Sequence, residues 1–224
     1  MPISFGIIPA ALTKNVGNFL NSVKRSHPEL IELHQHGWAH INHEGDRGEG
    51  EFGPARSYDQ QREDLQRGRD TLEQSFGDGF FPAFSPPWNV YSAGTIRALK
   101  ELSFEVLSAG SDDFGVNGGG IQHYPSTLDL TNWGAVGRLQ TRRDLFVRIV
   151  ALLTKVRGPV GLLSHHRRMA PEEFKILESL LLRLTQTDQV VFHTFESLEM
   201  KRPRALGELD LMSTAARCGG NDGE

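Results

Sequence analysis

The chain has 224 residues, 38% hydrophobic and 23% charged, which is enough for one substantial hydrophobic core. Its net charge of −4 and its scattered basic residues argue against nucleic-acid binding. The single cysteine, Cys218, rules out an internal disulfide and a cysteine-based metal site. No apolar run approaches the ~20 residues of a membrane span, and the N-terminus carries no export signal. We therefore expect a cytoplasmic protein without membrane contact, unless a signal lies upstream.

Strand-like apolar runs alternate with helical patterns along the chain. The strands are expected at residues 3–8, 30–33, 80–84, 104–107, 160–163 and 190–193. The helices between them are expected to start at Thr13, at a capping box of Ser57 and Gln60, before Ile96, at Thr141 and at Pro171. The first helix should bury Val16, Phe19, Leu20 and Val23.

A repeated strand-then-helix order with short links predicts a mainly parallel sheet covered by helices, either open or closed into a barrel. The pattern dissolves at about Lys201, where a basic segment leads into a Gly/Asn/Asp-rich end. We expect one domain over residues 1–200 and a flexible C-terminal tail over residues 201–224.

Four histidines lie within the ten residues from His34 to His43. His36 and His40 are four residues apart and can share one ion if the segment turns helically, so they are the candidate metal ligands. His34 and His43 are expected at the rim or behind the ligands. The alternative is a solvated loop that binds no ion. A catalytic zinc site usually takes three protein ligands, so a third must come from elsewhere.

The segment Ser-Pro-Pro-Trp-Asn at residues 85–89 follows a predicted strand. Two prolines fix its backbone, and a tryptophan offers a flat apolar face of the kind that stacks on a sugar ring. The alternative is a rigid turn with a core tryptophan. The candidate substrate-binding residues are Pro86, Pro87, Trp88 and Asn89.

His165 follows the predicted strand at 160–163, where a histidine beside a metal site is a natural general acid. A structural role is the alternative. Further candidates for partners behind the ligands, or for a substitute ligand, are His43, Asp112, Asp113, His123 and Asp129, which could equally be ordinary loop residues.

Together these segments resemble the polysaccharide deacetylase family, the NodB-homology class of metal-dependent carbohydrate esterases. The resemblance runs from Met1 to about Met200. Residues 7–10 look like the second strand of that fold, and residues 36–40 are similar to its H-x-x-x-H metal motif. Residues 85–89 resemble its groove-wall motif, and residues 163–165 match its catalytic L-x-H.

The resemblance implies a distorted (β/α) barrel and an N-acetylated carbohydrate substrate. In the family, an ion held by one aspartate and two histidines activates a water that attacks the N-acetyl carbonyl. The ion expected here is zinc, with cobalt or another divalent ion as alternatives. By the same resemblance, His165 would protonate the departing amine.

The chain departs from the family pattern at two points. The family opens with an Asp-Asp strand that supplies the general base and the third ligand, and residues 1–28 contain no acidic residue. Ser85 stands where many members place arginine. We therefore expect a barrel incomplete at the N-terminus, in either a shortened gene product or a divergent relative that has lost hydrolysis. A non-catalytic carbohydrate-binding pseudoenzyme is the rival function, and a purely structural metal site is a third.

Overall fold

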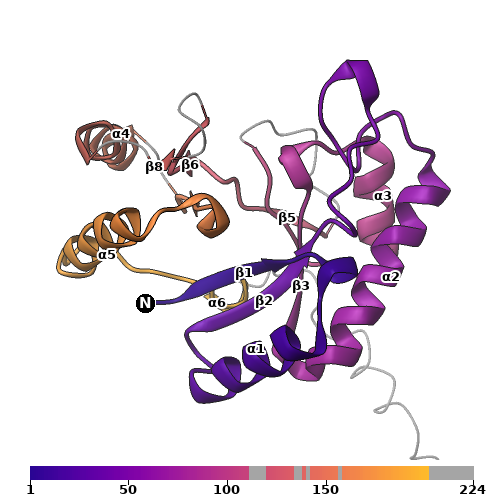
Figure 1. Cartoon of the computed structure of the whole chain (residues 1–224), viewed down its shortest axis with the longest axis horizontal. Helices are drawn as coiled ribbons and strands as arrows, with labels where there is room; N and C mark the ends of the chain where they lie inside the picture. The colour runs from indigo at the N-terminus through magenta and orange to yellow at the C-terminus, as the bar shows by residue number, and fades with distance from the viewer. Residues whose placement is uncertain (111–119, 134–137, 140–141, 156–157, 202–224) are drawn as a thin grey trace, which may run out of the picture.

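The computed structural model describes residues 1–110, 120–133, 138–139, 142–155 and 158–201 and shows an α/β fold built on a parallel sheet (Figure 1). Five parallel strands pair in the order β1-β2-β3-β4-β5. They are β1 (Ile3–Ile7), β2 (Ile31–His36), β3 (Phe80–Ser85), β4 (Val106–Leu107) and β5 (Gln122–His123). Since spatial order follows chain order, the sheet advances in one direction, as the wall of a (β/α) barrel does.

Three helices connect and cover these strands (Figure 1). They are α1 (Lys14–Ser26), α2 (Tyr58–Phe76) and α3 (Ala93–Glu101). Short 3-10 turns lie at Pro9–Ala11, Gly45–Arg47, Gly77–Gly79, Pro87–Asn89 and His166–Arg168. The main core lies between helices and sheet and includes Leu20, Leu33, Leu65, Leu72, Phe84 and Leu99.

The two faces of β2 differ because alternate side chains of a strand point to opposite sides of the sheet. The Gln35 amide faces α2, so close to Gly68 that a Cβ there would lie 2.2 Å from its nitrogen. The inner face instead carries the polar residues Glu32, His34 and His36. This polar face is where the candidate site forms.

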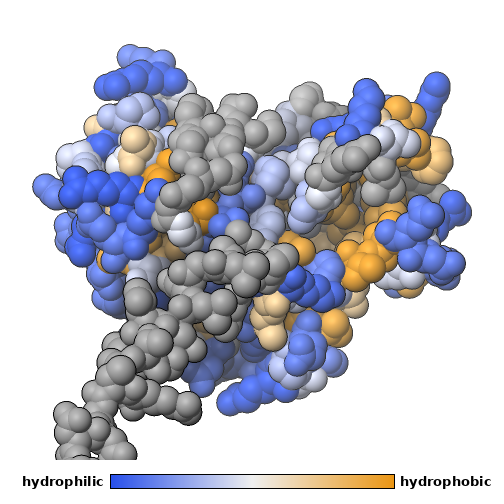
Figure 2. Space-filling model, turned by 180° about the vertical axis from the view of Figure 1, so that it is seen from behind, coloured by the Kyte–Doolittle hydropathy of each residue, from blue (hydrophilic) through white to orange (hydrophobic). Residues whose placement is uncertain are grey.

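The second half of the chain adds a smaller core (Figure 1). The strand pairs are β6 (Leu128–Asp129) with β9 (Leu162–Leu163), parallel, and β7 (Thr131–Asn132) with β8 (Arg138–Leu139), antiparallel. The helices are α4 (Arg142–Lys155), α5 (Pro171–Thr185) and α6 (Phe195–Lys201). Seen from behind, apolar side chains reach the surface around α4 and α5 (Figure 2), among them Phe146, Val147 and Leu182.

The buried carboxylate of Glu32 joins the first strands to the last helix. It accepts the backbone N–H groups of Phe195 at 3.1 Å and Glu196 at 2.8 Å, and the hydroxyl of Ser4 at 2.5 Å. Burial raises the pKa of Glu32, although these hydrogen bonds oppose the shift. The first turn of α6 is therefore held against the inner face of β2.

The predicted alternation is confirmed for most elements, including the Thr13 cap and the Ser57–Gln60 capping box. The strand predicted at 190–193 is wrong, since these residues form no regular structure and Val191 is 68% exposed. The predicted burial of Val16 and Phe19 in α1 is also wrong, because both of these side chains are largely exposed. The predicted burial of Leu20 is confirmed, Val23 packs against the core, and Gly17 is buried as well.

Some expectations lie outside the described residues. These are the Thr141 cap and the tail beyond residue 201. Within the described part of the chain, no helix has both the length and the apolar character needed to span a membrane.

Candidate metal and catalytic site

The candidate site begins where β2 and β3 end side by side, with His36 paired to Ser85. The Nδ1 atom of His36 lies 3.0 Å from the carbonyl oxygen of Ser85. A carbonyl can only accept, so this contact places the proton on Nδ1 and leaves the Nε2 lone pair free. Burial, and secondly His40, lower the pKa of His36 to about 4. The ring is therefore neutral near pH 7, as a metal ligand must be.

The rings of His36 and His40 lie together, with centroids 5.3 Å apart and planes tilted by 55°. The two rings meet although the segment between them does not turn helically, which was the condition considered for a shared ion. His36 ends a strand, Gly37 has φ +63° and His40 has φ +58°. A tight irregular loop, and not a helix, thus brings the two imidazoles to one place.

The loop from Gly37 to His40 is held by Glu51, a residue that the sequence analysis missed. The fully buried carboxylate of Glu51 accepts three backbone N–H groups, from Trp38 at 3.1 Å, Ala39 at 2.7 Å and His40 at 3.1 Å. Successive N–H groups that converge in this way form a concave anion site, which here is filled by the protein's own side chain.

Ser85 connects two histidines of the inner face. Its hydroxyl lies 3.1 Å from Nε2 of His34 and 3.0 Å from Nδ1 of His36. His34 is therefore not at the rim but buried behind the candidate ligand, where burial lowers its pKa to about 3. Ser85 is the position at which the resemblance noted above leads one to expect arginine. In this chain its hydroxyl helps to orient the His36 ring.

His165 follows β9 and is half-buried, with polar partners on one side of its ring. Its Nδ1 lies 3.0 Å from the hydroxyl of Thr131 and 3.6 Å from a carboxylate oxygen of Asp129. The rings of Trp133 and His165 pack in a T-shaped arrangement, with centroids 4.8 Å apart. Interaction with His165 makes the smallest contribution to the lowered pKa of His36, after burial and His40.

Trp88 packs against the candidate ligand His40, with the ring centroids 4.3 Å apart. It adopts φ +56° within the turn Pro87–Asn89, and it is only partly buried. Pro86 and Pro87 are buried behind it. Asn89 is exposed and lies 3.4 Å from the hydroxyl of Ser126. The segment is thus a rigid turn that leaves part of its tryptophan accessible.

Other candidates are not brought to the histidine pair. His43 is exposed, and its backbone N–H donates to the carbonyl of Gly50 at 2.8 Å. His123 lies in β5, and its buried Nε2 has no partner among the described residues. Asp112 and Asp113 lie outside the described residues. Within the part of the chain that the structure describes, no group of three metal-ligating side chains occurs.

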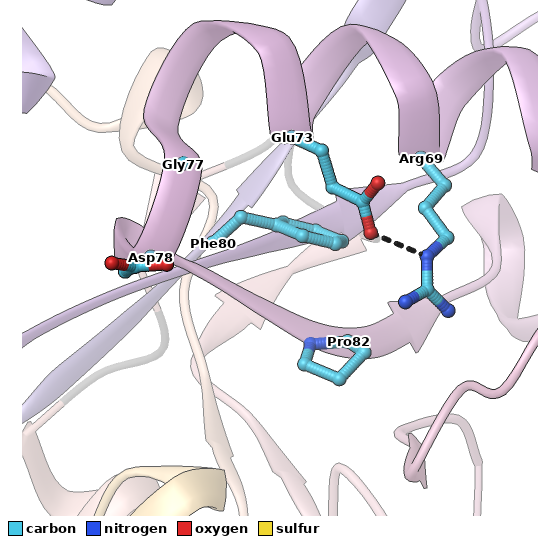
Figure 3. A pocket seen from close by; sticks show the side chains of 6 residues that line it. All are labelled: Arg69, Glu73, Gly77, Asp78, Phe80 and Pro82. Atoms are coloured by element: carbon cyan, nitrogen blue, oxygen red, sulfur yellow. Dashed lines mark hydrogen bonds and ion pairs between the residues drawn. The ribbon is translucent and has the colours of Figure 1, made fainter.

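A shallow hollow of about 360 Å³ lies at the start of β3, at the opposite end of that strand from Ser85 (Figure 3). Its lining consists of Arg69, Glu73, Gly77, Asp78, Phe80 and Pro82. Arg69 and Glu73, one turn apart on α2, form an ion pair at 2.6 Å (Figure 3). The hollow is therefore separate from the histidine site.

The sequence profile of the polysaccharide deacetylases matches residues 10–107. This span includes the histidine loop, Glu51 and residues 85–89, and it ends before His165. A search of curated proteins found no match.

Three solved structures resemble the chain. A protein from Mycobacterium smegmatis described as a polysaccharide deacetylase has 18% identity over 94% of this chain and 77% of its own, with a TM-score of 0.65. A CE4 family pseudoenzyme from Bacillus anthracis has 12% identity over 88% and 64%, with a TM-score of 0.50. A family 4 acetyl xylan esterase from Clostridium thermocellum, in complex with a cobalt ion, has 16% identity over 81% and 71%, with a TM-score of 0.47. The first likeness confirms the expected α/β fold of the distorted-barrel type.

Proposed function

We propose that this chain, whose residues 10–107 match the polysaccharide deacetylase profile, is a metal-dependent hydrolase that removes N-acetyl groups from an amino sugar or polysaccharide. The observation that carries the proposal is the His36 ring, fixed on the Ser85 carbonyl with its Nε2 free and with His40 beside it. Two imidazoles that converge on one point suit a divalent ion.

His36 and His40 fit such an ion, because the pair converges and the Nδ1 contact fixes the tautomer of the first ring. Zinc is the proposed ion, with cobalt or another divalent ion as alternatives. When bound, the ion would lower the pKa of a water and polarise the acetyl carbonyl. The third ligand does not come from the described residues.

His165 is the proposed general acid. Thr131 and Asp129 occupy its Nδ1 side, which orients the ring and leaves Nε2 to hand a proton to the departing amine. The negative charge of Asp129 stabilises the imidazolium form that must do this. Trp88, beside His40, offers an apolar face for the sugar ring.

A second candidate function is carbohydrate binding without turnover. It is favoured by the lack of a three-ligand group within the described residues. The CE4 family pseudoenzyme with a similar fold provides a precedent for this outcome. In that case Trp88 and Asn89 would hold the sugar while no acetate is released.

The two functions are separated by measuring acetate release and sugar binding on the same protein. N-acetylated chitooligosaccharide would be incubated with the chain and zinc or cobalt, with His36→Ala as control. Slow metal-dependent acetate release that the substitution abolishes supports the hydrolase. Binding of the oligosaccharide by calorimetry without any release supports the pseudoenzyme, and the absence of both contradicts the two proposals.

A further inference from the structure

The carboxylate of Glu51 is the charged group that the histidine loop encloses. Removing a carboxylate from water is costly unless charge-assisted hydrogen bonds replace the solvent. Glu51 obtains them from three successive peptide N–H groups, those of Trp38, Ala39 and His40. The loop therefore supplies the hydrogen-bond donors that the buried carboxylate needs, and the carboxylate supplies the acceptor that the three N–H groups need.

The remaining polar groups of the loop have their own partners. The carbonyl of Gly37 accepts from the Gln35 amide at 3.1 Å, and the carbonyl of Trp38 accepts from the N–H of Ala10 at 3.0 Å. The N–H of Gly37 donates to Ser85 at 3.2 Å. Among the described contacts, the three following N–H groups depend on Glu51 alone.

The conformation that Glu51 stabilises is one that most residues avoid. His40 has φ +58° and Gly37 has φ +63°, both in the left-handed region. A Cβ at Gly37 would lie 2.0 Å from a carboxylate oxygen of Glu51, so only glycine fits there. Such backbone persists only where its surroundings enforce it.

The loop conformation also decides where the His40 ring lies. His36 is fixed by β2 and by Ser85, whereas His40 lies beyond the strand and depends on the loop. We propose that Glu51 is a positioning residue of the metal site: its carboxylate shapes the loop so that the His40 ring meets the His36 ring. The inference rests on the proposed function for the role of the two histidines.

Glu51→Gln tests this inference, and Glu44→Gln is a matched control. Glutamine is isosteric, but its amide nitrogen cannot accept, so at least one of the three N–H groups loses its partner. Glu44 is also buried and also accepts a backbone N–H, that of Ala55 at 3.0 Å. The recorded contacts of its carboxylate involve neither Trp38, Ala39 nor His40.

Two measurements apply to each variant. Titration with cobalt(II), followed by visible absorption, gives metal affinity, and hydrogen exchange of the metal-free protein gives protection of the Ala39 and His40 amides. Glu51→Gln is expected to weaken cobalt binding by ~10–100-fold, the usual effect of losing a group behind a ligand. It should also accelerate exchange at these amides, while Glu44→Gln leaves both readouts unchanged.

Equal cobalt affinity and unchanged exchange in Glu51→Gln would overturn the inference, as would equal losses in both variants. If Glu51→Gln does not fold, Glu51→Asp replaces it. Aspartate keeps the charge but withdraws the carboxylate, so intermediate affinity and exchange are expected. Should the wild-type chain bind no cobalt, the proposed function fails, yet the exchange of the metal-free loop still decides what Glu51 does.

Discussion

The hydroxyl of Thr131 lies 3.0 Å from Nδ1 of His165. Thr131 begins β7, and His165 lies two residues after the end of β9, which belongs to a different strand pair. Asp129 adds a carboxylate oxygen 3.6 Å from the same nitrogen. One side of the imidazole is thus occupied by partners that hold its orientation. The other side is left for a reaction partner, which is the arrangement that a general acid requires.

Replacing His165 with alanine is expected to reduce acetate release by ~10²–10⁴-fold, the usual contribution of a positioned acid. Cobalt affinity should remain close to wild type because the proposed ligands are His36 and His40. His166, the exposed neighbour, provides the control. If His166→Ala loses activity while His165→Ala retains it, the catalytic role has been assigned to the wrong histidine.

Replacing either His36 or His40 with alanine leaves one imidazole. Each variant should therefore lose the cobalt absorption band, or should require at least ~10-fold more cobalt to reach the midpoint of the titration. Thermal unfolding of the metal-free proteins shows whether the fold survives. His43→Ala is the matched control from the same cluster, because its side chain is exposed. Retention of the full cobalt signal in both ligand variants would refute the metal site.

Trp88→Ala is expected to weaken oligosaccharide binding by ~3–10-fold, which corresponds to an aromatic contact of about 0.5–1.5 kcal/mol. Trp88→Phe should restore part of the loss, since a smaller flat ring remains. Calorimetry with the metal-free protein separates this effect from metal binding. Unchanged sugar affinity in the alanine variant would show that Trp88 only packs against His40.

The carboxyl group of Asp129 makes the stability of the fold depend on pH. Burial alone would raise its pKa, but its interactions with His165, Trp133 and Thr131 outweigh this effect and lower it. A lowered pKa stabilises the fold above the unfolded value of about 3.9, and this stabilisation is lost as the pH falls through the folded value.

Asp129→Asn should therefore be less stable than wild type at neutral pH, and its free energy of unfolding should fall less steeply below about pH 4. Urea unfolding at a series of pH values measures both. Parallel curves for the two proteins would mean that Asp129 does not carry this linkage.

Local signals explain which parts of the fold could be predicted. The Thr13 cap and the Ser57–Gln60 box are contained in a few adjacent residues, and both occur as expected. The run at 190–193 has the composition of a strand, but no neighbouring strand pairs with it in the described structure, and α6 begins directly afterwards. The composition of a segment indicates only its propensity to form a strand, whereas the formation of a strand also requires a neighbouring strand with which it can pair.

Parts of the candidate site could be predicted from residue type alone, and other parts could not. His36 and His40 were singled out by their spacing, although a loop and not a helix brings them together. Glu51 has no motif to reveal it, because its partners are backbone amides, which every residue possesses. The role of Ser85 depends likewise on the register between β2 and β3.

The hydrogen bonds of Glu32 also set an order of events during synthesis. This residue leaves the ribosome early, whereas its partners Phe195 and Glu196 follow 163 and 164 positions later. Until they emerge, the carboxylate must stay hydrated, so the inner face of β2 cannot close around His34 and His36. The histidine site is therefore completed only after residues 195 and 196 have emerged from the ribosome, and nascent chains that stall earlier carry its ligands on an open, unfinished sheet.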